Sequence, residues 1–324
     1  MIDLDVLITT YPQAFLYHGG GEAELLDLAA NLRALGVKAD IYGPHSRPLA
    51  AYDTVLHFSV QGSGLGIVEE VKRAGKRLVL WPNLWWVNSP SADERSLVQR
   101  FFDLADCVVF KSRTERDAVL AHVKLGDRKV AMSTWGVDPS YGRPADPMMF
   151  KTIYRLSDYI LWLGIIEERK NQLTAIEALR DQSTPVVFIG DYRDKAYYDA
   201  CIKTAPKHFR FLPHMPAKSE ILRSALQNCR VYLEVPHDPP GLSALEAGLA
   251  ERPLVLSSGA WSSEQFGDAA VLVDCSSRAS IRDGVEGALA EPAKSAGELV
   301  RHGHLYPHCL QSFVHLLERS PATA

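Results

Sequence analysis

The chain has 324 residues, enough for about two average domains, and its 47% hydrophobic and 23% charged content is typical of a soluble globular protein. A net charge of −4 argues against a general nucleic-acid-binding surface. The sequence shows no membrane-spanning run and no secretory signal. Its five cysteines are scattered without a C-x-x-C pair, which favours buried, unpaired thiols in a reducing cytosol over disulfides or zinc.

Short apolar runs alternate with amphipathic segments through the first half of the chain. Leu25, Leu28, Leu32 and Leu35 recur at three- to four-residue spacing and predict a helix over 22–35. Alternation of strands and helices implies a parallel sheet with crossover helices. The predicted strands are 5–10, 37–42, 54–60, 77–81, 107–110 and 129–133.

Residues 136–157 interrupt this alternation. They carry Pro139, Gly142, Pro144 and Pro147 and no apolar period, so we interpret them as a domain connection. The alternation then restarts, with a helix over 218–228 and strands at 159–163, 185–189, 209–212, 231–235, 254–257 and 271–273. We therefore predict an α/β protein of two Rossmann-like, doubly wound domains, 1–150 and 151–305. A C-terminal helix within 306–324 is expected to pack back towards the first domain.

A glycine-rich loop follows the first predicted strand. Gly19, Gly20 and Gly21 stand between His18 and Glu22, just before the first helix. Glycines leave the backbone accessible, and a helix N-terminus offers free N–H groups to an anion. The spacing is neither G-x-G-x-x-G nor a P-loop, which weakens dinucleotide and ATPase interpretations. A flexible turn is the alternative.

A charged loop follows the strand at 159–163. It reads Gly164-Ile-Ile-Glu-Glu-Arg169-Lys170-Asn171 and leads into a helix. A lysine at a helix start opposes the helix dipole, and an anionic ligand would compensate for this. Lys170 is therefore a candidate anion-binding residue, with a solvated charged turn as the alternative.

The most informative segment is Asp238-Pro-Pro-Gly241-Leu-Ser-Ala-Leu-Glu246-Ala. Gly241 stands where a loop becomes a helix, so its backbone N–H can approach an anion. Glu246 lies further along a helix that is apolar nearly all round, and a partly enclosed carboxylate needs hydrogen-bond donors. This arrangement suits a ligand with a phosphate in the middle and hydroxyl groups at both ends, such as a nucleotide-sugar.

Together the three loops resemble those of GT-B-fold glycosyltransferases, and within them glycosyltransferase family 4. That family typically has a glycine-rich first loop, a G-R-L-x-x-x-K-G/N segment and an E-P-x-G-L-x-x-L-E-A motif. Shorter matches at Phe110-Lys-Ser112, Trp135-Gly-Val-Asp138 and 267–274 keep the motif order along nearly the whole chain. The resemblance implies two domains facing a central cleft, with 1–150 on the acceptor side and 151–305 holding the nucleotide-sugar.

The resemblance also implies roles for residues of the second domain. Glu246 would hold the ribose of the donor nucleotide, and Asp238 would contact hydroxyls of the transferred sugar. The backbone at Gly241 and Leu242 would face sugar and phosphate, and Lys170 would neutralise the leaving diphosphate. Lys170, Asp238 and Glu246 are thus the candidate catalytic residues.

In the first domain the resemblance brings Gly20 and Gly21 close to the diphosphate. Asn83 and Trp85, which follow the strand at 77–81, are candidate acceptor contacts. The cluster of Trp81, Trp85 and Trp86 predicts a stacking platform for a sugar acceptor, a part of the core, or a hydrophobic patch that binds a partner.

Three departures from the family pattern concern the site. Ile165 replaces the usual Arg, which removes one cation from the diphosphate site, and Arg169 is a candidate substitute. Asp238 is one methylene shorter than the usual Glu. The His that often follows the strand matching 77–81 is missing, and Asn83 is the nearest match.

No metal site is predicted. His302, His304 and His308 form the nearest set, but Pro307 interrupts any shared helical face and no Cys or carboxylate joins them at ligand spacing, which favours a surface cluster. In the family's chemistry, as carried over, Lys170 and backbone N–H groups stabilise the leaving diphosphate in place of a divalent ion. No cofactor is expected besides the donor substrate.

The resemblance therefore implies a retaining, metal-independent, cytoplasmic glycosyltransferase of the hexosyltransferase kind. It would move a sugar from a nucleoside-diphosphate-sugar to a hydroxyl of a carbohydrate, lipid-linked or small-molecule acceptor, as part of carbohydrate biosynthesis. Neither nucleic acid nor a transmembrane segment is expected, and peripheral membrane contact stays open. Two alternatives also stay open: a nucleotide-sugar epimerase of the same fold, and a nucleotide- or sugar-binding protein that has lost turnover.

Overall fold

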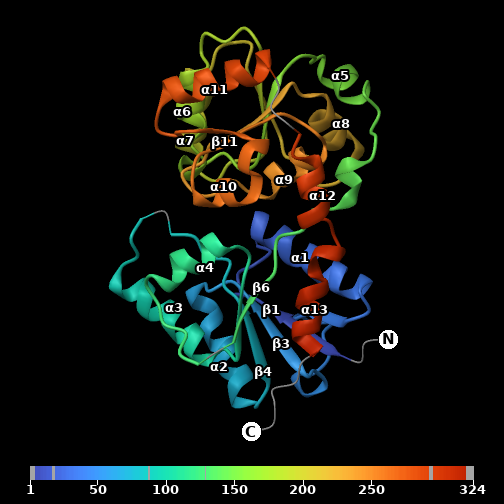
Figure 1. Ribbon diagram of the computed structural model, residues 1–324, viewed down its shortest axis with the longest axis vertical. Coiled ribbons are helices and arrows are strands. Elements are labelled where there is room, and N and C mark those ends of the chain that lie inside the picture. The colour runs from blue at the N-terminus through green and yellow to red at the C-terminus, as the bar shows by residue number, and fades with distance from the viewer. Residues whose placement is uncertain (1–3, 17–18, 87, 128, 292–294, 319–324) are drawn as a thin grey trace. The chain divides into compact units, whose positions relative to one another are not determined.

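The computed structural model describes residues 4–16, 19–86, 88–127, 129–291 and 295–318 (Figure 1). The chain divides into two compact units. Unit 1 comprises Met1–Gly136 and Tyr306–Ala324, and unit 2 comprises Val137–Leu305. Each unit is built on a six-stranded sheet whose neighbouring strands are all parallel. The predicted α/β fold with two doubly wound domains is confirmed.

The sheet of unit 1 has the order β2-β1-β3-β4-β5-β6. The last helix of unit 1, α13, comes from the C-terminal end of the chain and is drawn in red beside the blue elements of the same unit in Figure 1. The strands are β1 (Asp5–Thr9), β2 (Lys38–Ile41), β3 (Thr54–Phe58), β4 (Arg77–Trp81), β5 (Cys107–Phe110) and β6 (Lys129–Met132), and the α-helices are α1 (Gly20–Ala34), α2 (Leu65–Arg73), α3 (Ala92–Leu104), α4 (Arg113–Leu120) and α13 (Gln311–Glu318).

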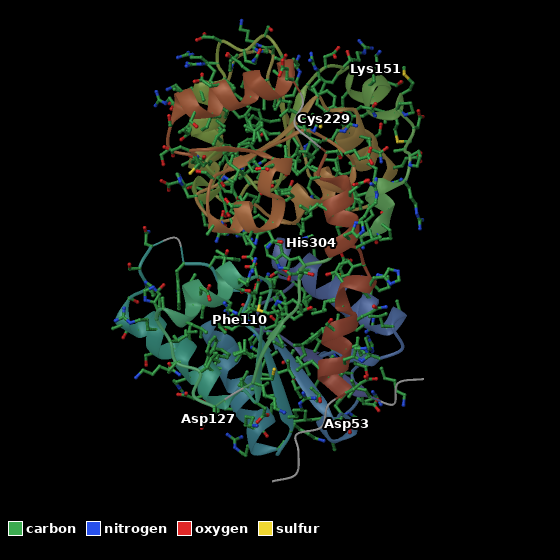
Figure 2. The ribbon with its side chains drawn as sticks, in the orientation of Figure 1. Asp53, Phe110, Asp127, Lys151, Cys229 and His304 are labelled. Atoms are coloured by element: carbon green, nitrogen blue, oxygen red, sulfur yellow. The ribbon has the colours of Figure 1, made fainter. Side chains whose placement is uncertain are left out.

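Alternating side chains of the inner strands β1, β3, β4 and β5 enter two different cores, as the period of two in a strand requires. Val6 and Ile8 of β1 pack with residues of α1 and α13, whereas Leu7 between them packs with residues of α2 and α3. Phe110 of β5 belongs to the second core and is fully buried (Figure 2). Burial of both faces explains why these strands read as continuous apolar runs.

The sheet of unit 2 has the order β12-β11-β10-β7-β8-β9. One of its cores packs the β7, β8 and β10 strands against helices α6, α7 and α11. The strands are β7 (Ile160–Leu163), β8 (Val186–Ile189), β9 (Arg210–Leu212), β10 (Val231–Glu234), β11 (Leu254–Ser257) and β12 (Val271–Val273), and the α-helices are α5 (Met149–Tyr154), α6 (Gln172–Ala178), α7 (Lys195–Thr204), α8 (Glu220–Asn228), α9 (Leu242–Leu249), α10 (Ala260–Phe266), α11 (Arg278–Ala290) and α12 (Gly297–Gly303).

The boundary between the units differs from the predicted one. Residues 137–150, which the sequence placed in the first domain, belong to unit 2. They are held there by α8: Ser224 Oγ donates to the carbonyl of Asp146 at 2.6 Å, and Gln227 Nε2 donates to that of Arg143 at 2.7 Å. The prolines of this segment mark an irregular path over unit 2, and not a free linker.

Both sheets contain a point at which the strand order reverses. In unit 1 the chain leaves β1 first to β2 and later to β3 on the other side. In unit 2 it leaves β7 first to β8 and later returns to β10 on the other side. Ligands of open parallel sheets bind beyond the carboxyl ends of the strands at such reversals. The loops after β7 and β10 are therefore the place in unit 2 to look for a site.

Candidate functional site

The loops after β7 and β10 are joined by an ion pair between two predicted site residues. Lys170 Nζ lies 3.2 Å from Oδ1 and 3.3 Å from Oδ2 of Asp238. Both side chains are mostly buried, with 18% of Lys170 and 10% of Asp238 exposed. The backbone N–H of His237 also donates to the carbonyl of Arg169 at 3.0 Å. The predicted charged loop and the predicted carboxylate loop thus form one structure.

Asn171 ties the loop after β7 to the loops after β10 and β12. Its side chain is buried, and Nδ2 donates to the carbonyls of Val235 at 3.0 Å and Cys275 at 2.8 Å, which follow β10 and β12. The residue has a φ of 65°, in the left-handed region that asparagine tolerates better than most residues. Lys170 itself closes a short 3₁₀ turn, Glu168–Lys170, and Asn171 separates it from α6. The predicted helix start therefore lies two residues beyond Lys170.

The charged side chains of this region form a chain of ion pairs. Arg169 Nε lies 3.4 Å from Asp238 Oδ2, and its guanidinium lies 3.3 Å from Glu167 Oε1. Glu167 in turn pairs with Arg193, from the loop after β8, at 3.4 Å. Three cations (Arg169, Lys170 and Arg193) thus share two carboxylates, which leaves a net positive charge for an anionic ligand. The sequence analysis did not identify Arg193.

Arg193 reaches this region because the loops after β7 and β8 run together. Gly190 has a φ of 158°, and a Cβ there would lie 2.0 Å from the carbonyl oxygen of Gly164. Glycine is therefore required at position 190 for the close approach. The contact continues with a hydrogen bond of 2.8 Å from the N–H of Ile166 to the carbonyl of Asp191.

The N-terminus of α9 is held by a buried glutamate that the sequence analysis missed. Glu234, the last residue of β10, is 2% exposed. Its Oε1 accepts from the backbone N–H of Gly241 at 2.9 Å, and its Oε2 accepts from the hydroxyls of Tyr232 at 2.8 Å and Ser243 at 2.9 Å. Gly241 is the N-cap of α9, as its sequence position predicts. Its N–H, which we expected to face an anion, already donates to Glu234.

Glu246 lies on α9 close to this network. It is half-buried, and it is placed three residues after Ser243, which puts the two side chains on the same side of the helix. Burial raises the pKa of Tyr232 well above its usual range, and the carboxylates of Glu234 and Glu246 add to that rise. Leu242, the first residue of α9, is also half-buried. The predicted motif therefore brings Asp238, Gly241 and Glu246 to the end of β10 and the start of α9.

In unit 1 the predicted glycines and Asn83 lie together. Gly20 and Gly21 form the first turn of α1 after the N-cap Gly19, and His18 lies outside the described residues. A Cβ on Gly21 would be 3.5 Å from Nδ2 of Asn83, in the loop after β4. Asn83 has a φ of 48° and accepts a hydrogen bond at Oδ1 from Nζ of Lys111.

The tryptophans at the end of β4 and in the loop after it differ in burial. Trp81 is 2% exposed and packs edge-on against Phe313 of α13, with ring centroids 5.2 Å apart. It is therefore part of the core and not of a stacking platform. Trp85 and Trp86 are half-buried, and Trp86 packs edge-on against His122.

A buried histidine stands at the strand reversal of unit 1. His57 of β3 is fully buried, stacks on Phe101, and has Nδ1 2.9 Å from Oγ1 of Thr9 at the end of β1. Burial lowers its pKa to about 4. Nε2 points at Gly64, where a Cβ would be 2.9 Å away. His57 is therefore a neutral packing residue at physiological pH.

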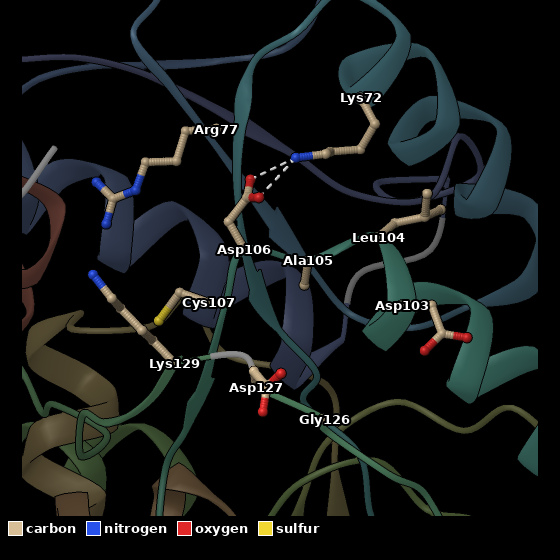
Figure 3. A pocket seen from close by; sticks show the side chains of 10 residues that line it. All are labelled: Lys72, Arg77, Asp103, Leu104, Ala105, Asp106, Cys107, Gly126, Asp127 and Lys129. Carbon is tan, nitrogen blue, oxygen red and sulfur yellow. Dashed lines mark hydrogen bonds and ion pairs between the residues drawn. The ribbon is translucent and has the colours of Figure 1, made fainter. Parts of the chain in front are cut away.

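A pocket of about 620 Å³ lies at the opposite end of the same sheet (Figure 3). Its lining includes Arg77, Cys107 and Lys129, the first residues of β4, β5 and β6. Lys72 and Asp106 pair across it at 2.7 Å. Since ligands of parallel sheets bind at the carboxyl ends of the strands, this amino-terminal pocket is not the site indicated by the topology.

The structure corrects two smaller expectations. His304 is 5% exposed, so the three C-terminal histidines do not form a surface cluster. Cys275 and Cys309 are half-buried, whereas Cys107, Cys201 and Cys229 are buried; all five are free thiols.

Among the residues that the structure describes, no group of three or more His, Cys, Asp or Glu is placed to hold a metal ion, and no helix is long and apolar enough to cross a membrane.

No family model matches the chain. No curated protein matches it significantly either.

Solved structures, in contrast, match over almost the whole chain. Sucrose-phosphate synthase from Thermosynechococcus elongatus superposes with a TM-score of 0.79 at 12% identity, covering 96% of this chain and 98% of that one. HepE from Anabaena, solved with UDP and glucose, gives 0.76 at 14% identity, covering 98% and 100%. A UDP-forming α,α-trehalose-phosphate synthase from Burkholderia xenovorans, solved with glucose 6-phosphate, gives 0.71 at 14% identity, covering 97% and 100%.

These similarities define the fold class. The chain has the GT-B fold, with two Rossmann-like units that match glycosyltransferases of that fold from end to end. At 12–14% identity the likeness is one of fold, so the activity has to be argued from the site itself.

Proposed function

We propose that the protein is a glycosyltransferase that takes a sugar from a nucleoside-diphosphate-sugar donor, with the donor bound by unit 2. The observation that carries the proposal is the Lys170–Asp238 pair, which stands at the strand reversal of a Rossmann-like sheet with Arg169 beside it. A cation and a carboxylate so placed offer one partner for a diphosphate and one for sugar hydroxyls.

The surrounding residues support a nucleotide ligand. Glu246 is a half-buried carboxylate on α9, suited to accept hydrogen bonds from ribose hydroxyls. Arg169 and Arg193 add positive charge to the site. Arg169 is the candidate to replace the cation that is missing at Ile165. Leu242 and Ser243 lie in the first turn of α9, where helix N–H groups face outward, whereas the N–H of Gly241 donates to Glu234 and that of Ala244 to the carbonyl of Gly241.

The chemistry proposed is transfer with retention of configuration and without a divalent ion. Charge that develops on the leaving diphosphate would be stabilised by Lys170 and Arg169, because preorganised cations act most strongly where charge appears in the transition state. Asp238 would release Lys170 to the diphosphate and turn to the hydroxyls of the sugar. In unit 1, the first turn of α1 at Gly20 and Gly21, together with Asn83, would contact the substrate from the acceptor side.

Two of the three solved proteins named above are linked to UDP: HepE was solved with UDP bound, and the trehalose-phosphate synthase is UDP-forming. We therefore propose a uridine nucleotide as the first donor to test. The experiment is a thermal-shift screen with UDP, GDP, ADP, TDP and CMP, followed by an array of acceptors with the sugar form of the best nucleotide. One nucleoside diphosphate should raise the melting temperature, and the same nucleotide should be released on addition of an acceptor.

The same experiment separates the alternatives. Isomerisation of the donor sugar without any acceptor would show an epimerase. Tight nucleotide binding without transfer to any acceptor in a broad array would show a binding protein that has lost turnover. Failure of all five nucleotides to shift the melting temperature would contradict the proposal itself.

A further inference from the structure

A buried lysine in unit 1 has no role in the function proposed above. Lys111 directly follows β5 and is 2% exposed. Its Nζ lies 3.1 Å from both carboxylate oxygens of Glu24, which stands on α1 and is 5% exposed. An ion pair this deeply buried is costly to desolvate and contributes little net stability compared with well-packed apolar residues. The Lys111–Glu24 ion pair lies at the carboxyl end of the sheet, where ligands bind, so a role in ligand binding has to be considered.

The surroundings of Lys111 match an ammonium group. An ammonium has three N–H donors, and three acceptors surround this one: the carboxylate of Glu24, Oδ1 of Asn83 and the ring face of Trp135, whose centroid is 4.1 Å away. Burial lowers the pKa of Lys111 and raises that of Glu24, while the opposite charge of each partner acts against this. The charged form is the one that satisfies every group in the cluster.

A second buried carboxylate holds the loop that carries Asn83. Glu115 of α4 is fully buried, and its Oε2 accepts from the backbone N–H of Lys111 at 2.6 Å. Its Oε1 accepts from the backbone N–H of Leu84 at 3.2 Å. The loop after β4 is thus tied to the loop after β5 through both the side chain and the backbone of Lys111.

This arrangement determines how the carboxamide of Asn83 points. Because Oδ1 accepts from Lys111, the Nδ2 group must face the other way, and it lies beside Gly21 in the first turn of α1. Gly21 has no side chain to cover it, and Asn83 is only half-buried. The two N–H donors of the amide are therefore presented next to the N-terminus of α1, from a residue whose φ of 48° lies in the left-handed region that asparagine tolerates better than most residues.

We propose that Lys111 is a positioning residue for Asn83: it holds the carboxamide so that Nδ2 donates hydrogen bonds to an oxygen of the acceptor substrate beside the first turn of α1. The acceptor role rests on the proposed transferase function, whereas the orientation of Asn83 does not. Freed of Lys111, the amide can rotate and present its oxygen, which has no N–H to donate to the oxygen of the acceptor substrate.

The orientation is tested without any substrate. The chain has five asparagines, so selective ¹⁵N-asparagine labelling gives five side-chain NH₂ pairs, and Asn83→Ala identifies the one of interest. The double variant Glu24→Leu with Lys111→Met removes both partners of the ion pair, while the buried carboxylate of Glu115 keeps its two backbone N–H donors. We expect the Asn83 pair to move to the position of a freely solvated amide while the other four stay. An unchanged Asn83 pair in the folded double variant overturns the proposal.

A reciprocal measurement does not depend on the folding of that variant. Asn83 is half-buried, so Asn83→Ala should fold, and ¹⁵Nζ-lysine labelling then reports on the buried ammonium of Lys111. Loss of its Asn83 partner should shift that slowly exchanging signal. The same signal in the wild type and in Asn83→Ala would overturn the proposal.

The acceptor role is tested by kinetics with UDP-glucose and the acceptor found in the array. Asn83→Ala and the double variant should each raise the acceptor KM at least about tenfold, while the Kd for UDP, bound by unit 2, stays within about twofold. An unchanged acceptor KM overturns the role. A protein that transfers to no acceptor overturns it together with the proposed function, and the two NMR measurements still decide the orientation of Asn83.

Discussion

Lys170 and Asp238 face each other from the two loops that flank the strand reversal of unit 2, with Nζ 3.2 Å from Oδ1. The two residues come from segments 68 positions apart, and Asn171 locks both segments to a third loop. A cation that is already paired with a carboxylate attracts an anion less strongly than a free one. In the proposed function, Asp238 would thus limit the affinity for a diphosphate until a sugar engages the carboxylate.

Removing that carboxylate should strengthen the binding of the bare diphosphate. In Asp238→Asn both Lys170 and Arg169 lose a competing partner, and even at the value of an exposed ion pair this competition is worth about 1 kcal/mol. We expect the Kd for UDP to fall roughly fivefold and the activity with UDP-glucose to fall as well, since the sugar loses its carboxylate. Calorimetry with UDP measures the first effect, and weaker UDP binding in this variant would argue against it.

Glu246→Ala should weaken nucleoside binding itself. A charge-assisted hydrogen bond to a ribose hydroxyl contributes about 1.5–3 kcal/mol. The loss should be the same for uridine and for UDP, because the ribose is common to both. Glu286→Ala, an exposed carboxylate on α11, is the matched control. Unchanged affinity for uridine in a folded Glu246→Ala protein would remove Glu246 from the site.

Glu234 should act through stability and not through ligand contact. Glu234→Ala leaves the N–H of Gly241 and the hydroxyls of Tyr232 and Ser243 without their shared acceptor, inside the protein. We expect a loss of about 3 kcal/mol or more in the free energy of unfolding, measured by urea denaturation. A variant as stable as Glu286→Ala would show that the network does not hold α9.

His57 should make the protein sensitive to acid. Its pKa is about 4 in the folded protein and 6.5 when unperturbed, so the unfolded chain binds the extra proton between these values. Stability should therefore fall as the pH drops from about 6.5 to about 4, by about 3 kcal/mol for this residue. His57→Gln, which does not titrate, should lack this part of the loss in urea titrations across that range. Identical pH profiles for the two proteins would contradict the assignment.

The regular elements of this fold could be predicted because their sequences follow simple periods. All twelve predicted strands form, with ends shifted by at most two residues. Buried parallel strands read as unbroken apolar runs, and the glycine at 241 marks the start of α9 as its lack of a side chain suggests. The segment 137–150 was misplaced because its docking on α8 depends on side-chain contacts of Ser224 and Gln227, which no periodicity reveals.

The candidate site could be predicted only in part, for a related reason. Residues in recognisable motifs, such as Lys170 and Asp238, were found, and the topology brings them together. Glu234, Lys111 and Arg193 were missed, because no sequence pattern connects them with their partners Gly241, Glu24 and Glu167. Glu24 and Lys111 are 87 positions apart, and only the parallel sheet makes them neighbours.

The proposed function depends most directly on Lys170, which would be the cation that binds the diphosphate of the donor. Calorimetric titrations of UDP and of uridine should be compared for the wild type, Lys170→Met and Lys195→Met, the last removing a solvent-exposed ion pair of the same unit. We predict that the wild type binds UDP, that Lys170→Met weakens UDP binding at least about tenfold with little change for uridine, and that Lys195→Met matches the wild type. Equal losses for UDP and uridine, or unchanged UDP binding in Lys170→Met, would contradict the central claim.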